Sequence, residues 1–450
     1  MLWAHFYQSL LFRRKVDGEI MGNTTNLKNE GKFFYGWWIV IGCTVIMAVL
    51  FAAIINTFSL YVLPVTTGLN IDRSEFTYLY SIMTFASMIG NPIFGMLVKK
   101  MKIRVMVTGS VLLAFLGELM LSQANGLGMI YLAGVILGIA LSGGATIPVS
   151  VLITNWFEEK RGLCMGIAMA GSGVGGMILT PIVTWLLAAY GWRTAYLIVG
   201  IIILVCIVPF SAFVFRLHPE EKGLKPYGSD SIEGSRSEEK KPVSGLSYAE
   251  TLKKPRFWLL CITIVLVAIV INAIVVNLVP LLTDMGAPGK AITASVSLAG
   301  MFIIIGKIVS GRVFDKLGIT AGIILLMACT TVQFLFLYRP TSSMFCMLFI
   351  GFHGLGAPAA NLLPAIVIGP LFGDRDYAAK YGITSLCAAL GAALSSFVAG
   401  VLYNSSHGYV SLITFSLVLS VICFALFMMI IKTSPQMEAE EESSAQSEVI

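Results

Sequence analysis

The chain is dominated by apolar runs of about 20 residues that are separated by short polar breaks. At the 1.5 Å rise of an α-helix, a run of that length crosses the hydrocarbon core of a bilayer. Charged residues make up 12% of the chain, about half their share in soluble globular proteins, which excludes that class. The runs predict an all-α membrane protein with transmembrane helices near residues 37–63, 76–98, 105–123, 128–153, 162–189, 193–215, 257–282, 291–313, 320–338, 343–368, 382–403 and 409–431.

A long polar stretch separates the first six of these twelve predicted spans from the last six. It contains SDSIEGSRSEEKKPVSG, whose Ser, Gly, Glu and Lys content is typical of a disordered linker. The first 32 residues lack the features of a signal peptide, and we expect a cytoplasmic tail that starts at Met1 or Met21. The expected parts are a tail (1–32), a six-helix bundle (33–215), a cytoplasmic linker (216–256), a second six-helix bundle (257–431) and an acidic cytoplasmic tail (432–450).

The basic residues indicate how the chain is oriented. Placing both termini in the cytoplasm puts 25 of the 30 Lys and Arg residues on the cytoplasmic side and only four in the outer loops, as the positive-inside rule requires. We therefore expect a multi-pass protein of the plasma membrane with both termini cytoplasmic. The net charge of +6 is explained by these loops, so no nucleic-acid partner is expected.

Lys307 lies inside the apolar run 291–313, where a charge is costly. Intramembrane lysines usually face a cavity or a partner, which makes Lys307 a candidate for a binding site. Gly300 and Gly311 lie near it on the helical wheel and predict open space beside the amine. The alternative is a lysine whose stem carries the amine to the membrane interface.

Glu118 is the other ionisable carboxylate or amine deep within a span. It is either a structural acid or a proton-coupling residue, as Lys307 also could be. The polar residues Asn56, Tyr61, Asn272 and His353 are further candidates for substrate binding. Each of them alone is more often a packing or helix-helix hydrogen-bonding group. The same holds for Tyr80, Asn277 and Asn361.

The two halves repeat one another. The segment that begins at Gly95 after the second span corresponds to the segment that begins at Gly311 after the eighth. Residues 134–166 correspond loosely to 349–382, with glycines, a mid-span proline and a charged turn in the same order. Parallel repeats of six spans are typical of secondary transporters whose site lies at the interface between the repeats.

The segment after the eighth span contains the pattern G-x-x-x-D-[RK]-x-G as Gly311, Asp315, Lys316 and Gly318. In this the chain resembles the major facilitator superfamily, which implies that fold and a conformational gating role for these four residues. The first-half copy departs from the pattern, with Lys99 at the position of the acid. This departure argues against a latch of the same kind in the first half.

Further segments are similar to the oxalate:formate antiporter and monocarboxylate transporter branch, namely NWFEEKRG at 155–162, GIAMAGSGVGG at 166–176, GWRTAY at 191–196 and LFGDR at 371–375. In that branch a cation on the eighth span holds the substrate carboxylate, and Lys307 falls on its position. The eleventh-span cation of oxalate transporters has no counterpart at 383–389. Asn56 and Ile303 stand where proton-coupled relatives carry a lysine and an aspartate. The resemblance therefore favours a monoanion over oxalate.

These observations predict a secondary transporter of a small organic anion, a monocarboxylate, that works by alternating access with proton symport. The alternatives are an anion:anion antiporter of the oxalate/formate type and a non-transporting ligand sensor. No nucleophile-base pair, ATP-binding signature or metal-ligand spacing of the eight cysteines is present, so we expect no enzyme, cofactor or metal. The expected partners are the anion, a proton or counter-anion and membrane lipid, and we expect a monomer.

Overall fold

The computed structural model describes residues 34–229, 245–338, 342–403 and 408–432. The predictions for the tails 1–32 and 433–450, for the choice between Met1 and Met21, and for linker residues 230–244 lie outside these ranges. By its contacts the chain divides into residues 1–38 and 39–450, and all packing reported below lies within 39–450. The domain boundaries at 216 and 256 remain predictions.

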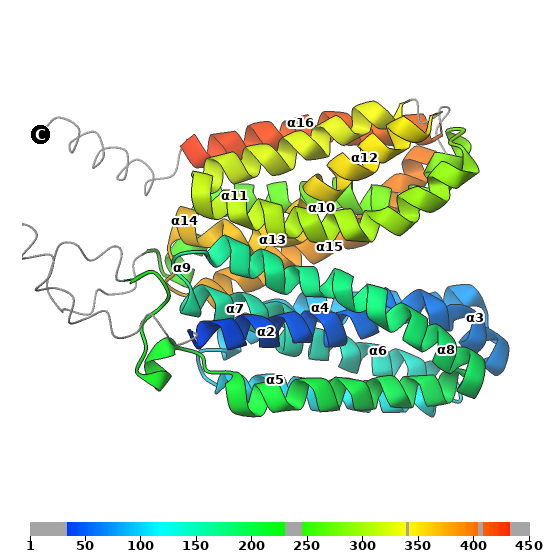
Figure 1. Ribbon diagram of the computed structural model, residues 1–450, viewed down its shortest axis with the longest axis horizontal. Helices are drawn as coiled ribbons and strands as arrows, with labels where there is room; N and C mark the ends of the chain where they lie inside the picture. Colours follow the sequence, from blue (N-terminus) through cyan, green and yellow to red (C-terminus); the bar gives the residue numbers. More distant parts are fainter. Residues whose placement is uncertain (1–33, 230–244, 339–341, 404–407, 433–450) are drawn as a thin grey trace, which may run out of the picture. The chain divides into compact units, whose positions relative to one another are not determined.

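The described residues are almost entirely helical, and Figure 1 colours them from blue to red along the chain. The first half consists of α2 (Gly36–Ile46), η2 (Met47–Asn56), α3 (Phe58–Leu69), α4 (Arg73–Leu97), α5 (Ile103–Ser122), α6 (Leu127–Leu141), η3 (Ser142–Thr146), α7 (Ile147–Trp156), α8 (Arg161–Pro209) and η4 (Phe210–Val214).

The connection contains η5 (Pro219–Lys222) and α9 (Tyr248–Leu252), and the second half follows it. Its helices are α10 (Pro255–Asp284), α11 (Gly289–Leu337), α12 (Ser343–Gly356), α13 (Ala359–Ile366), α14 (Ile368–Phe372), α15 (Tyr377–Tyr403) and α16 (Tyr409–Lys432).

Nine helices among the described residues are long and apolar enough to cross a membrane. Two of these are long enough to cross it twice, and each turns at a glycine with positive φ. The 54-residue segment 161–214 turns at Gly191 (φ 75°), and the 40-residue segment 298–337 turns at Gly318 (φ 80°). With α4, whose 25 residues occupy the second predicted span, all twelve predicted spans are present as helices, and the fold prediction is confirmed.

Several helices begin where the sequence supplies a cap. Asp72 and Glu75 form a capping box at the start of α4, and Ser247 and Glu250 form one at the start of α9. Pro255 occupies the first turn of α10, where its missing N–H costs no hydrogen bond. The polar breaks between the apolar runs therefore fix the helix starts as well as the turns.

Within each half, neighbouring helices pack along much of their length, as α4 does on α6 and α11 on α12. The most extensive contacts between the halves join α4 with α15 and α8 with α11, and smaller ones join α7 with α15 and α8 with α13. The glycine-rich segment 166–176 of α8 makes close backbone contacts. A Cβ at Gly175 would lie 1.9 Å from the carbonyl oxygen of Ala48, and one at Gly166 would lie 2.3 Å from that of Lys307. This stretch is therefore a packing surface.

Candidate functional site

A cavity of about 370 Å³ lies between the two halves and contains Lys307. It is lined by η2, α4, α6, η3 and α8 from the first half and by α10, α11, α13 and α15 from the second. Two π-helical segments, η2 and η3, contribute to it, and such wide turns often occur at functional sites because they displace the side chains that follow. Its polar lining residues are Tyr80, Thr84, Ser87, Asn91, Thr146, Ser172, Asn272, Lys307, Asn361, Tyr381 and Ser385.

The amine of Lys307 reaches from α11 across to α8. Its Nζ donates to the carbonyl oxygen of Met169 (2.9 Å) and to the hydroxyl of Ser172 (3.0 Å). Lys307 is buried, at 6% exposure. In this conformation its amine therefore does not extend to the membrane interface, as a snorkelling lysine would. A lysine ammonium has three donors, and two are used, which leaves one for a ligand in the cavity.

Among the described residues that line the cavity there is one cation and no carboxylate. No described Asp or Glu lies within ion-pairing distance of Lys307. A buried ammonium without an anionic partner is costly, because hydrogen bonds to neutral oxygens replace only part of its hydration. The arrangement therefore favours a ligand that brings a negative charge.

The structure brings some of the predicted site residues to this cavity and separates others from it. Asn272 lines it together with Lys307, as do Tyr80 and Asn361. The amide of Asn56 donates to the carbonyl oxygen of Ser172 (2.8 Å), so Asn56 supports the residue that holds Lys307. Asn56 itself is not among the lining residues.

Tyr61 and Glu118 lie together at a much smaller cavity inside the first half. The Tyr61 ring stacks on Tyr196 with 3.9 Å between ring centroids. The Tyr61 hydroxyl and the Oε2 atom of Glu118 are buried without a hydrogen-bond partner within the described part of the chain. Neither residue lines the Lys307 cavity, so direct substrate contact is not supported for Tyr61 in this conformation.

His353 is also away from the cavity. Its Nδ1 lies 2.7 Å from Oε1 of Gln333, and both side chains are buried between α12 and α11. The pair satisfies two polar groups that would otherwise be buried without partners. In this conformation His353 joins two helices of the second half.

The most informative contacts that the sequence did not predict involve small polar residues. The Asn91 amide donates to the hydroxyl of Ser385 (2.9 Å), which joins α4 to α15 across the cavity. Ser172, which accepts a hydrogen bond from Lys307, lies in the glycine-rich segment 166–176, whose sequence gives no sign of this contact. The spacing of Ser, Thr and Asn within one apolar helix gives no signal of which face meets the partner half.

Asp315 and Gly311 form a tight contact between the halves. The two carboxylate oxygens of Asp315 accept from the backbone N–H groups of Gly162 (2.6 Å) and Leu163 (2.7 Å) in the first turn of α8. A Cβ at Gly311 would lie 2.1 Å from the carbonyl oxygen of Gly162, so the expectation of open space there is wrong. Gly300 does have open space beside it. Lys316 is exposed, and Gly318 forms the turn.

The first half has a different contact at the corresponding place. Lys99 forms an ion pair with Asp376 at the start of α15. Nearby, Arg161 binds Asp374 through two hydrogen bonds of 3.0 and 2.9 Å. The first half thus has a lysine where the motif of the second half has Asp315, and this lysine contacts an acid of the other half. These contacts lie at the same end of the helices as the Asp315 contact.

Lys380 strengthens this end of the second half. Its side chain is fully buried, and its amine donates to the carbonyl oxygens of Leu246, Phe372 and Gly373 at 2.8 to 3.1 Å. The amine thereby ties the connection to the turn before α15. Three carbonyl oxygens satisfy all three donors, so Lys380 has none left for a ligand.

Comparison with known proteins identifies the family. The sequence model described as the Major Facilitator Superfamily matches residues 43–366. Monocarboxylate transporter 12 of Xenopus laevis is 26% identical over 437 residues, which cover 92% of this chain and 94% of that protein. The uncharacterized MFS-type transporter YcxA of Bacillus subtilis is 23% identical over 395 residues, which cover 85% of this chain and 92% of that protein.

The fold is shared with a solved transporter. A crystal structure of a bacterial homologue of the human lysosomal transporter Spinster, inward-facing and unoccupied, superposes with a TM-score of 0.56. The match covers 90% of this chain and 98% of that chain at 16% identity, which shows the fold alone. No group of His, Cys, Asp or Glu within the described residues could hold a metal ion. Because the family model covers most of the chain, the chain belongs to the Major Facilitator Superfamily, and it is a multi-pass membrane transporter rather than an enzyme.

Proposed function

We propose that the protein transports a small monocarboxylate by alternating access, with Lys307 as the group that binds the carboxylate. The observation that carries this proposal is the buried Lys307 ammonium, which faces the cavity with one donor unused and no described acid beside it. The similarity to monocarboxylate transporter 12 supports the same substrate class.

The charge of the cavity argues for one carboxylate per substrate. A dianion such as oxalate would place a second carboxylate among Tyr80, Asn272 and Ser385, which carry no positive charge. That second charge would lose its hydration without an ionic partner. The volume of about 370 Å³ accommodates a small organic acid, and the neutral polar groups supply hydrogen bonds that orient it.

We propose proton symport as the mode of coupling. An arginine stays charged throughout the accessible pH range, whereas a lysine amine can release its proton. An empty carrier with a neutral Lys307 could change state without carrying an unpaired charge through the membrane interior. Uptake of a proton together with the anion would then be electroneutral. Anion exchange is the second candidate, and it requires Lys307 to remain charged.

The alternation would open and close the end of the helices where Asp315 meets α8 and Lys99 meets Asp376. We place this end and both termini in the cytoplasm, because the basic residues gather in the loops on that side. The proposed location is the plasma membrane and the proposed working unit is a monomer. Gly311, Asp315, Lys316 and Gly318 serve this gate in the proposal.

The test uses proteoliposomes that contain a pH-sensitive dye and a labelled monocarboxylate outside. The wild-type protein should acidify the lumen as the anion enters, and Lys307→Ala should abolish both signals. Lys307→Arg should retain anion exchange but lose net proton-linked uptake. Lys290→Ala, which removes an exposed lysine from the first turn of the same helix, is the matched control and should behave as wild type. A Lys307→Arg protein that acidifies the lumen at the wild-type ratio would refute proton binding by Lys307.

A further inference from the structure

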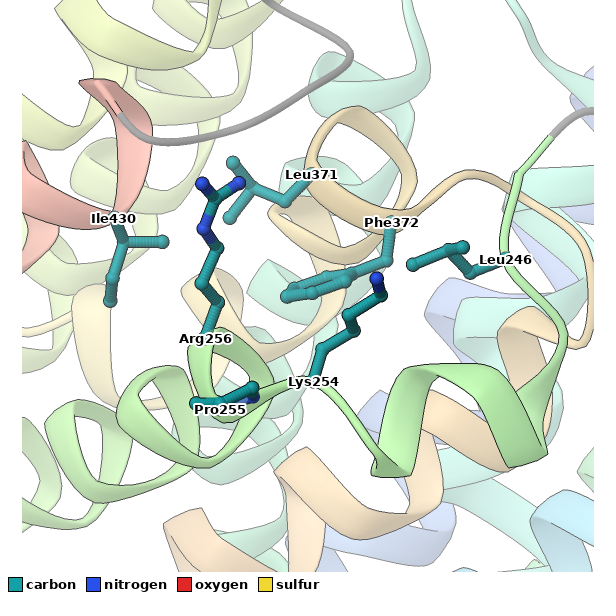
Figure 2. Close-up of a pocket in the computed structure, with 7 residues that line it drawn as sticks. All are labelled: Leu246, Lys254, Pro255, Arg256, Leu371, Phe372 and Ile430. Atoms are coloured by element: carbon teal, nitrogen blue, oxygen red, sulfur yellow. The ribbon is translucent and has the colours of Figure 1, made fainter.

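Another cavity, of about 270 Å³, lies away from the Lys307 site, where α10 begins and α16 ends. Figure 2 shows Lys254 and Arg256 extending in the same direction from the start of α10, toward the turn that carries Leu371 and Phe372. Ile430, near the end of α16, closes another side. The walls are thus apolar, while two cations come from one short segment.

The charged groups of Lys254 and Arg256 do not bind other parts of the described chain. The ammonium of Lys254 and the guanidinium of Arg256 have no hydrogen bond or ion pair with any other described residue. The acid on the preceding helix, Glu250, is engaged elsewhere, because its Oε2 accepts from the backbone N–H of Ser247 (2.7 Å). The positive charge at this cavity is therefore available to a ligand from outside the chain.

An apolar groove of about 720 Å³ adjoins the cavity and shares Pro255 and Arg256 with it. It runs past Trp258 and Ile262 on α10 and Met429 on α16. These three side chains are 49%, 54% and 54% exposed, on helices long and apolar enough to cross the membrane. Tryptophan is enriched where a membrane meets water, which places the boundary close to Trp258 and the two cations close to the lipid headgroups.

We propose that this cavity and groove bind one anionic phospholipid. The phosphate would lie between Lys254 and Arg256, and an acyl chain would follow the groove along Trp258, Ile262 and Met429. Basic pockets between transmembrane helices are suited to phosphate-bearing headgroups, and the guanidinium of Arg256 offers a bidentate geometry that matches phosphate. The site thus matches both parts of the lipid, because the two cations suit its phosphate and the apolar groove suits its acyl chain.

A lipid bound in this cavity would also stabilise the transporter. Leu246 and Phe372 line the cavity, and their carbonyl oxygens accept from the buried amine of Lys380. A lipid in the cavity would therefore contact the connection, α10, α14 and α16 at once. We expect it to raise the thermal stability of the full-length protein, whatever substrate the Lys307 cavity carries.

The experiment measures lipid retention by native mass spectrometry on delipidated full-length protein. Phosphatidylglycerol and phosphatidylcholine with identical chains are added separately, and melting is followed in parallel. At about 1 kcal/mol for each basic residue near a lipid surface, losing both cations should weaken phosphatidylglycerol binding roughly 30-fold. Lys254→Gln/Arg256→Gln should show this loss. Lys100→Gln/Lys102→Gln, which removes two exposed lysines from the first half, should bind as wild type.

Three outcomes would overturn the proposal. Equal retention of the two lipids would show that the headgroup charge is not recognised. Wild-type retention by Lys254→Gln/Arg256→Gln would place the lipid elsewhere. Stabilisation by inorganic phosphate or glycerophosphate as strong as that by the lipid would show a site for a free phosphate. Arg256→Lys keeps the charge and should bind more weakly than wild type but better than the double variant, which separates a binding defect from misfolding.

Discussion

Replacing Gly311 by alanine should separate α8 from α11 at the gate. A Cβ at this position would lie 2.1 Å from the carbonyl oxygen of Gly162, whereas ordinary van der Waals contact begins at 3.4 Å. The contacting atom belongs to the backbone, so no side-chain rotation can relieve the overlap. The helices must therefore move apart by about 1.3 Å, the difference between these two distances, at this point.

This displacement has a cost that can be worked out from the Asp315 contacts. Its hydrogen bonds to Gly162 and Leu163 measure 2.6 and 2.7 Å, and an added 1.3 Å takes both beyond the usual limit of about 3.2 Å. Hydrogen bonds to charged groups contribute about 1.5–3 kcal/mol each. Because Asp315 is exposed, we take the lower end, about 3 kcal/mol for both, which shifts the gate equilibrium roughly 150-fold toward the open state.

Single-molecule fluorescence transfer between labels at Lys100→Cys and Lys316→Cys measures this equilibrium, because these exposed positions lie on opposite halves. The partly exposed Cys206 is first replaced by serine, since the other seven cysteines are buried. Gly311→Ala should move most molecules from the short-distance to the long-distance state. Gly300→Ala is the matched control on the same helix, because a Cβ there meets nothing within 4 Å. An unchanged distribution for Gly311→Ala, or an equal change for Gly300→Ala, would show that the close contact of Gly311 with Gly162 does not hold the gate closed.

Two further predictions concern the gate and the orientation. Lys99→Glu should place a second negative charge beside Asp376. It should shift the gate equilibrium toward the open state by about 1 kcal/mol or less, because Lys99 is half exposed. Lys99→Glu/Asp376→Lys should restore the wild-type distance distribution, and failure of this double variant would exclude the ion pair as the cause. With both termini in the cytoplasm, Ala287→Cys should react with impermeant reagent from outside the cell and Lys222→Cys only from inside. The reverse labelling pattern would overturn the orientation.

The sequence predicted features that depend on the chemistry of single residues. A lysine within an apolar run is too costly to be accidental, so Lys307 could be identified without a structure. The twelve spans follow from run length, and the turn at Gly318 follows from the polar segment that interrupts the apolar pattern. These signals are local in the chain and need no knowledge of which helices are neighbours.

The sequence could not show which face of a helix meets which partner. His353 and Asn272 both interrupt apolar helices, yet the first lies against Gln333 and the second lines the cavity. The ten-residue π-helix η2 changes the helical phase, so a 100° wheel misplaces the residues that follow it. Lys380 looks like an ordinary loop cation, and its burial depends on three carbonyl groups brought together by the fold.

Competition for counterflow of a labelled monocarboxylate in proteoliposomes shows whether one buried ammonium binds one carboxylate. We expect lactate, pyruvate or formate to compete at lower concentration than oxalate or malonate, because Lys307 is the one cation among the described lining residues. We also expect Lys307→Ala to abolish counterflow and Lys290→Ala to retain it. Stronger competition by the dicarboxylates would show that another cation reaches the site, and wild-type counterflow by Lys307→Ala would show that Lys307 does not bind the carboxylate.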